Sequence, residues 1–275
     1  MTIDFTQWSI LWPAFVAGLL VTATHVPLGM QVLDRGIVFI DLAIAQVAGL
    51  GVIFADYLGW EPTGAAVQVA ALASALACAA LLTWTDRRWP EVQEAIIGVV
   101  FAIAASLAIL VLAKNPHGGE SLKDLLSGQI LWVSAERLPF EAVVYGLILA
   151  LWFGMRGKLG RTGFYVLFAC AVTISVQLVG LFLVFSTLVM PALCTYYSRR
   201  LRYVKAYAIG VLGYAVGLVL SLLLDLPSGA TIVCAMLLAG VLVGLASARR
   251  DRRAVLAPRY AASDAAGTAA ARPDR

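Results

Sequence analysis

Charged and titratable side chains are scarce in this chain of 275 residues. Asp, Glu, Lys and Arg together make up 13% of it, and it has only two histidines and four cysteines. A soluble domain usually carries about 25% charged residues. Since 61% of the residues are hydrophobic, the composition excludes an ordinary soluble domain and indicates a protein that lies within a membrane.

The motifs of common enzyme and nucleotide-binding sites are also missing. The sequence contains no GxxxxGK[ST], HExxH, GxSxG or CxxC pattern, so it lacks the usual P-loop, zinc-protease helix, nucleophile elbow and paired thiols. The four cysteines lie singly in apolar runs, where they are typical of small buried hydrophobic residues. We therefore expect a protein that is not an enzyme and that holds no resident cofactor.

Long apolar runs dominate the chain instead. Most of them have roughly the ~20 residues that cross a bilayer as one helix. They predict an all-α, polytopic transmembrane bundle surrounded by membrane lipid. The runs cover residues 8–32, 37–57, 64–84, 94–113, 139–155, 164–197, 205–224 and 230–247.

Lysine and arginine gather at alternate ends of these runs, and the positive-inside rule assigns those ends to the cytoplasm. The run 164–197 has basic clusters on both sides, so it must cross an even number of times. This run is too short for two full spans. We therefore expect it to be interrupted near Val179 and Gly180, with a long helix and a short helix on either side of the break. The prediction is about nine crossings with the N-terminus outside and the C-terminus inside. The alternative is eight crossings, if one of the basic clusters lies on the outer side of the membrane.

The net charge of +4 comes entirely from the C-terminal tail. Residues 249–275 hold seven arginines and three aspartates, and they are rich in Ala, Gly, Ser and Pro without an apolar period. Such a composition is typical of disorder. We expect a transmembrane domain over 1–248 and a basic, disordered cytoplasmic tail over 249–275, with no nucleic acid as partner.

One carboxylate interrupts the second apolar run. Asp41 lies six residues after Arg35 in an otherwise apolar stretch. A charge in the middle of a transmembrane helix costs about 2.5–3.5 kcal/mol, so it must face protein, water or a passing cation rather than lipid. The alternative is a structural role, in which Asp41 pairs with a snorkelling Arg35 or with a helix end.

Five groups of segments carry a recognisable order and spacing between about Pro13 and Leu245. They are Leu28–Gln46 with Gly51-Val52, Glu94–Phe101, Leu126–Ser134, Ser175–Gly180 with Val189–Ala192, and Asp225–Gly229. Each is weakly specific alone. In this order, they make the chain resemble the membrane permease subunits of ABC importers for zinc, manganese and iron ions.

This resemblance implies a multi-pass protein of the bacterial inner membrane whose fold is related to the permeases for vitamin B12 and iron siderophores. It implies a homodimer with an ABC ATPase subunit below each copy and a periplasmic metal-binding protein above. ATP hydrolysis would drive alternating access. The substrate would be a divalent metal ion, zinc or manganese, which passes through without being a bound cofactor.

The sequence departs from the family where metal would be held. The family usually has Asp-x-x-x-His in its second span, with both side chains on one helical face. Here Asp41 matches the aspartate, but Ala45 stands four residues further on and Gln46 five. Either the histidine is lost, or a π-bulge brings Gln46 into its place, because on a regular helix Gln46 would lie about 140° from Asp41. The flanking match at Gly51-Val52 favours the bulge.

His25 in the first span is a third candidate, and it would supply an imidazole if it faced Asp41. Its alternative role is that of a core histidine bonded to a backbone carbonyl. We expect Asp41, Gln46 and His25 on the transport pathway, with Asp41 and Gln46 as transient metal ligands.

The contact with the ATPase is expected in the segment that follows the broken pair of helices. Pro191, Ala192, Arg199 and Arg200 lie there, at a cytoplasmic end that finishes in a basic run. The alternative is that this run only sets the orientation of the chain.

Two further functions stay open at this point. One is a permease of the same fold for a metal chelate, which the missing histidine favours. The other is a cation-coupled secondary transporter, in which Asp41 would carry a proton or sodium ion.

Overall fold

The computed structural model describes residues 5–60, 64–112, 130–155, 160–198 and 201–246, and the regular structure in these residues is helical throughout. The predicted all-α fold is therefore confirmed. The helices are α1 (Phe5–Arg35), α2 (Ile40–Tyr57), α3 (Ala65–Arg88), α4 (Gln93–Leu112), α6 (Leu138–Gly154), α7 (Gly160–Val179), α8 (Leu181–Cys194), α9 (Arg202–Leu224) and a last helix, Ser228–Ala246, with short 3-10 turns η1 (Pro90–Val92) and η2 (Ile130–Trp132).

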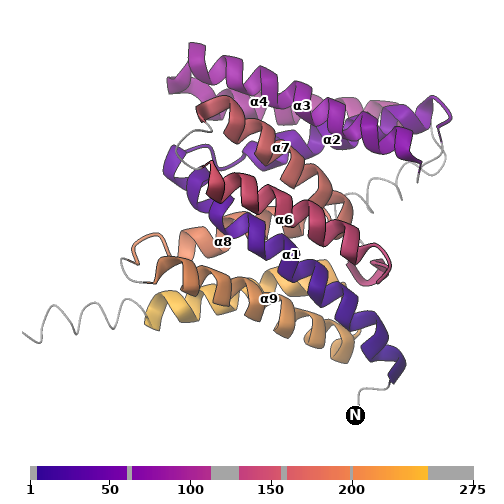
Figure 1. The fold of residues 1–275 in the computed structure, drawn as a ribbon, viewed down its shortest axis with the longest axis vertical. Helices are drawn as coiled ribbons and strands as arrows, with labels where there is room; N and C mark the ends of the chain where they lie inside the picture. Colours follow the sequence, from indigo (N-terminus) through magenta and orange to yellow (C-terminus); the bar gives the residue numbers. More distant parts are fainter. Residues whose placement is uncertain (1–4, 61–63, 113–129, 156–159, 199–200, 247–275) are drawn as a thin grey trace, which may run out of the picture.

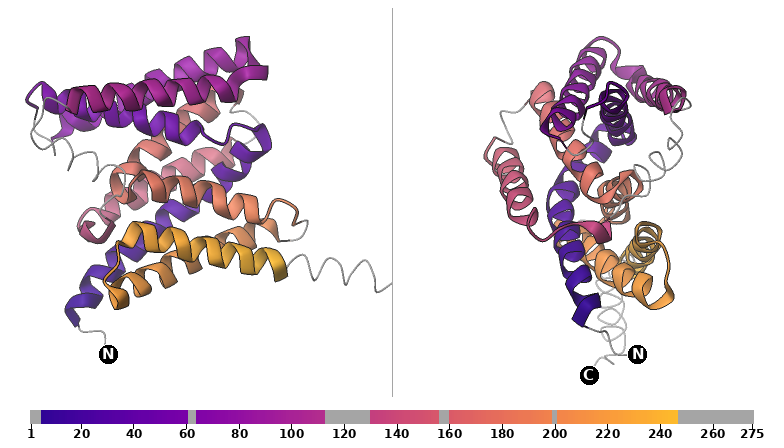
Figure 2. Two further views of the ribbon diagram at one scale, coloured as in Figure 1. Left: turned by 180° about the vertical axis from the view of Figure 1, so that it is seen from behind. Right: turned by 90° about the vertical axis from the view of Figure 1, so that its right-hand side faces the viewer.

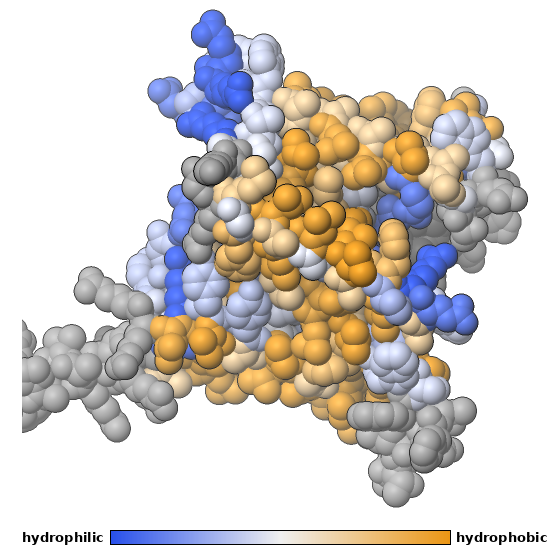
Figure 3. Space-filling view, viewed as in Figure 1, coloured by the Kyte–Doolittle hydropathy of each residue, from blue (hydrophilic) through white to orange (hydrophobic). Residues whose placement is uncertain are grey.

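Seven of the described helices are long and apolar enough to cross a membrane, while α6 and α8 are shorter apolar helices. α4 and the last helix are the least buried of the seven, so most of their apolar surface faces outward. Figure 3 shows an apolar surface across the middle of one face, with hydrophilic residues gathered at its left and right edges. The predicted multi-pass bundle is confirmed by this arrangement.

The helix α1 runs diagonally through the centre of the bundle (Figure 1). It packs against α6, α7, α8, α9 and η2. On one side α2 packs with α3 and α4, and on the other side α9 lies beside the last helix (Figure 2). The two groups meet through α1, α7 and α8, which therefore form the interior of the molecule.

The predicted break at Gly180 is confirmed. α7 ends at Val179 and α8 begins at Leu181, and Gly180 between them has φ 86° and ψ 161°, a conformation that is essentially limited to glycine. The Gly180 N–H donates to the Val176 carbonyl at 2.8 Å, and its own carbonyl accepts from Val184 at 3.1 Å. These two bonds satisfy the backbone groups of Gly180 itself, and the chain turns back there from α7 into α8 (Figure 1).

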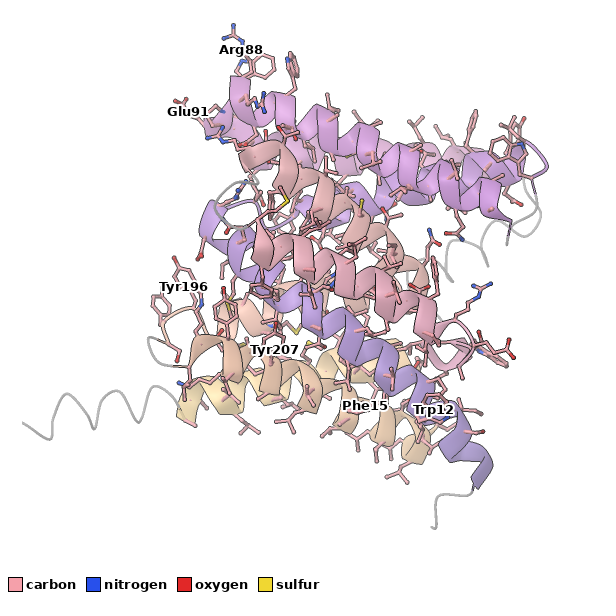
Figure 4. The ribbon with its side chains drawn as sticks, viewed as in Figure 1. Trp12, Phe15, Arg88, Glu91, Tyr196 and Tyr207 are labelled. Carbon is pink, nitrogen blue, oxygen red and sulfur yellow. The ribbon has the colours of Figure 1, made fainter. Side chains whose placement is uncertain are left out.

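The two ends of the bundle carry different residues. Arg88, Glu91 and Tyr196 lie at one end, and Trp12 lies towards the other (Figure 4). The end with Arg88 is the one that the arginine pattern assigns to the cytoplasm, and this orientation stays a prediction. The predicted tail 249–275 and most of the loop between α4 and α6 fall outside the described residues.

Candidate functional site

Asp41 lies in the first turn of α2 rather than in the middle of a span. The structure ends α1 at Arg35, and Gly36 follows with φ 70°, a conformation that suits glycine. Phe39 caps α2, which begins at Ile40, so Asp41 is close to the free backbone N–H groups of a helix start. The expectation of a mid-helix carboxylate is wrong, because the chain breaks its helix six residues before Asp41.

The Asp41 carboxylate is nevertheless fully buried, at 0% exposure. The nearest backbone amides are those of Asp41 and Leu42, but neither carboxylate oxygen accepts a well-formed hydrogen bond. Arg35 does not pair with it, since the Arg35 guanidinium lies 4.2 Å from the centre of the Phe164 ring. A buried carboxylate without a counter-charge is costly to keep ionised. A cation arriving at Asp41 would remove that cost.

A second carboxylate reaches the start of α2 from a neighbouring helix. Glu94 lies in the first turn of α4, and its Oε1 accepts a hydrogen bond from the Phe39 backbone N–H at 3.2 Å. Its Oε2 is buried without a partner, and its charge repels that of Asp41. Sequence reasoning used Glu94 only as part of a resemblance. The spacing of 53 residues between Asp41 and Glu94 gave no signal that Glu94 reaches the start of α2.

Gln46 does not share the face of Asp41. α2 is an α-helix from Ile40 to Tyr57 without a π turn, so the side chains of Asp41 and Gln46 point about 140° apart. Gln46 is buried, and Ala45, which stands four residues after Asp41, is fully buried. The structure therefore favours the alternative in which Ala45 replaces the family's histidine and no bulge brings Gln46 into line.

His25 lies deeper along α1. Ten residues separate it from Arg35, which is about 15 Å along a helix. Its Nδ1 lies 3.0 Å from the Val21 carbonyl and must donate to it, while Nε2 is buried without a partner. The structure does not bring His25 together with Asp41 through any described hydrogen bond. Metal-binding histidines commonly donate their other ring nitrogen in this way, so the free Nε2 keeps His25 a candidate.

Four residues were predicted to contact the ATPase, and two of them, Pro191 and Ala192, are buried. Ala192 packs with Val26 and Met30 of α1 and with Ala206 of α9. The exposed side chains nearby belong to the turn after α8, where Tyr197 is 90% exposed. Arg199 and Arg200 lie outside the described residues. A direct contact with another protein at this end therefore has to involve the turn and not the two buried residues.

A hollow of about 490 Å³ lies between α2, α3 and α4. It is lined by apolar side chains such as Leu50, Phe54 and Leu107, with Ser74 and Trp60 as polar exceptions. An apolar lining of this kind suits a lipid chain rather than a cation. Within the described residues, no three His, Cys, Asp or Glu side chains gather in a way that would hold a metal ion permanently.

Comparison with protein families gives one match that covers nearly the whole membrane part of the chain. The model of the ABC 3 transport family matches residues 7–162 and 150–247.

Two curated relatives with named substrates extend over most of both chains. The manganese transport system membrane protein MntC of Halalkalibacterium halodurans is 24% identical over 93% of this chain and 94% of its own length. The high-affinity zinc uptake system membrane protein ZnuB of Haemophilus influenzae is 21% identical over 82% and 94%.

Among solved structures, PsaBC from Streptococcus pneumoniae, in complex with Fab, matches with a TM-score of 0.67 and 20% identity. The match covers 87% of this chain and 91% of that chain. At this identity, the likeness shows a shared fold.

Proposed function

Because the chain belongs to the ABC 3 transport family, it is the permease subunit of a bacterial ABC importer and not an enzyme, and we propose that it imports a divalent metal ion, manganese or zinc. Alternating access carries the ion past Asp41. The named relatives support the choice of metals, since one is a manganese and the other a zinc transport protein.

The observation that carries this proposal is the fully buried Asp41 carboxylate without a hydrogen-bond partner. Ionisable groups within a membrane bundle are costly, and they mark ion pathways by default. As a divalent ion loses water on entering the protein, the carboxylate replaces part of its hydration shell. The absence of a complete ligand set lets the ion leave again, which transport requires.

We place His25 and Gln46 on the same pathway as secondary sites. The free Nε2 of His25 offers a lone pair deep in α1, and the buried Gln46 amide offers a neutral oxygen on another face of α2. An ion that moves between separate weak sites is never held tightly at one of them.

The working complex in this proposal is a homodimer of the chain with two ABC ATPase subunits and an external metal-binding protein. The ATPase contact lies at the turn after α8 that leads into the basic run Arg199–Arg202. Tyr196 and Tyr197 are exposed there, and Arg202 lies over the Tyr196 ring at 5.4 Å. The buried Pro191 and Ala192 support this turn from within.

A metal chelate is the second candidate substrate. It is favoured by Ala45, because a site without the family's histidine holds a bare zinc ion poorly. The cation-coupled secondary transporter considered above is set aside, since the family couples transport to ATP.

The test is metal uptake by proteoliposomes that hold the permease, its ATPase and its binding protein. Asp41→Asn keeps the size of the side chain and removes its charge. We expect uptake of one among Mn²⁺, Zn²⁺ and Fe²⁺ to fall at least about tenfold, while the complex still assembles. Unchanged uptake of all three ions would overturn the role of Asp41.

The matched control is Asp56→Asn. Asp56 lies in the last turn of α2, the same helix as Asp41, and its side chain is partly exposed. Uptake by this variant should equal that of the wild type. Uptake of a chelate in place of the free ions would select the second candidate.

A further inference from the structure

We propose that Glu94 is the second ligand of the transported ion, so that Asp41 and Glu94 form a two-carboxylate site where the family has a carboxylate and an imidazole. This inference rests on the proposed function, because it needs Asp41 to meet the ion. It adds a residue from a different helix and a preference for one class of metal.

The two side chains converge from α4 and α2, which pack closely against each other. Glu94 Oε1 is bound to the backbone N–H of Phe39, two residues before Asp41. This bond fixes the position of the Glu94 carboxylate beside the first turn of α2. Three oxygens are then left without partners, namely both of Asp41 and Oε2 of Glu94, and all three are buried.

The charge around this pair is not compensated by the protein. Of the arginines described near this end, Arg161 is bound to Asp86 at 3.5 Å and Arg35 lies over Phe164. Within the described residues, neither Asp41 nor Glu94 makes a salt bridge, and the two carboxylates repel each other. Two like charges near the start of α2, one of them fully enclosed, create a place where a divalent cation is favoured.

The burial of the pair suggests a direction of passage. Asp41 is completely enclosed, whereas Glu94 is partly exposed in the first turn of α4, next to the exposed Glu91 of η1. The ion therefore meets Asp41 within the bundle and Glu94 on the way to the end that carries Arg88. Glu94 is the last ligand before release at that end.

The ligand atoms determine which metals are favoured. Carboxylate oxygens suit hard cations such as Mn²⁺, and imidazole suits Zn²⁺. With Ala45 in the place of the histidine, the site offers only oxygen from these two side chains. The proposal therefore predicts transport of Mn²⁺ in preference to Zn²⁺.

A purely structural role of Glu94 has to be separated from this one. A glutamate at the start of a helix stabilises it by accepting a backbone hydrogen bond and by its charge, typically by 0.3–1 kcal/mol. Glu94→Gln keeps an oxygen that accepts the bond from Phe39 but removes the charge. Glu94→Asp keeps the charge on a side chain that is shorter by one carbon.

The experiment measures Mn²⁺ and Zn²⁺ uptake by the reconstituted complex for the wild type, Glu94→Gln, Glu94→Asp and Asp41→Asn. Glu91→Gln is the control, because Glu91 is an exposed glutamate three residues away at the same end (Figure 4). Assembly of each complex is checked by size-exclusion chromatography, and its ATPase activity is measured without metal. We expect Glu94→Gln to lower Mn²⁺ uptake at least about tenfold, Glu94→Asp to retain most of it, and Glu91→Gln to behave as the wild type.

Each outcome separates this inference from the function on which it rests. If Asp41→Asn stops uptake and Glu94→Gln does not, Asp41 acts alone and the two-carboxylate site is wrong. If both variants transport like the wild type, the proposed role of Asp41 fails as well. If Glu94→Gln does not assemble, Glu94→Asp decides, since an assembled complex that retains most of its Mn²⁺ uptake supports the site, whereas loss of assembly makes Glu94 a structural cap. Wild-type preference for Zn²⁺ over Mn²⁺ would also overturn the inference.

Discussion

At the scale of single residues, the buried polar groups of this chain divide into satisfied and unsatisfied ones. Most buried hydroxyls bond to a carbonyl one turn earlier in their own helix, as Thr22 does to Gly18 at 2.7 Å and Thr187 to Leu183 at 2.7 Å. Tyr145 and Ser175 pair across two helices at 2.6 Å. Asp41 and the Nε2 of His25 are among the buried polar atoms that have no described partner, as are single atoms of Gln93, Glu94, Glu141, Trp152, Thr173 and Arg202. Since buried polar groups are normally bonded, each such exception is a place to test for function.

His25 gives a prediction at this scale. His25→Phe fills a similar volume but removes the free Nε2, so uptake should fall by about tenfold or more if the nitrogen binds the ion. Transport of Mn²⁺ and Zn²⁺ into proteoliposomes is the measurement. Thr22→Val is the control, because the Thr22 hydroxyl is also buried on α1 and bonds to the Gly18 carbonyl at 2.7 Å, but the side chain has no imidazole nitrogen. Wild-type uptake by His25→Phe would make it a core histidine.

At the scale of elements, close approach of helices rests on small residues. Gly29 of α1 faces the backbone of α8, where a Cβ would come within 2.9 Å of the Leu188 carbonyl carbon and closer still to its oxygen. Gly213 of α9 faces the last helix in a similar way, with the Met236 Cα at 2.9 Å from an added Cβ. Backbones that approach this closely are typical of membrane helices, whose association depends on packing rather than on exclusion of water.

Gly29→Ala should therefore destabilise the bundle. The methyl group forces α1 away from α8, at a cost of about 1–3 kcal/mol for overpacking. We expect a lower thermal midpoint of the purified permease in detergent. Gly98→Ala is the matched control, since nothing described lies within 4 Å of an added Cβ on α4, and alanine favours the helix by about 1 kcal/mol over glycine. Equal midpoints for the two variants would contradict the packing argument.

At the scale of the whole molecule, the helices run back and forth between two ends of different character. Arg88 and Glu91 lie at one end and Trp12 towards the other (Figure 4). The described helices run in alternate directions from α1 to the last helix (Figures 1 and 2). Within the described residues, the start of α1 and the end of the last helix lie at opposite ends of the bundle (Figures 1 and 2), which agrees with the odd number of crossings that the arginine pattern predicts.

Cysteine labelling tests this orientation. In a background without the four native cysteines, Ser134→Cys should react with a membrane-impermeant maleimide added outside intact cells. Arg88→Cys should react only after the cells are opened. Both positions are exposed, so burial does not limit either reaction. Labelling of Arg88→Cys from outside would reverse the assigned orientation.

The sequence alone determined the class of the fold, because its period of long apolar runs permits only membrane-spanning helices, whose backbone groups must bond internally. It also located the break at Gly180, since a helix run flanked on both sides by basic residues has to turn within the membrane. It singled out Asp41 as a charge that is costly to place within a membrane. The order of short segments along the chain showed the family resemblance. These features depend on local composition and on distances along the chain.

The tertiary structure decided what meets at the site. It showed that Asp41 stands at a helix start, because the helix break after Arg35 is set by a glycine turn whose position the apolar run does not reveal. It separated Gln46 from Asp41 by keeping α2 regular. It brought Glu94 of α4 to the Phe39 backbone N–H at the start of α2, and it buried Pro191 and Ala192. Such contacts depend on how helices pack against each other, and a single sequence carries no record of that packing.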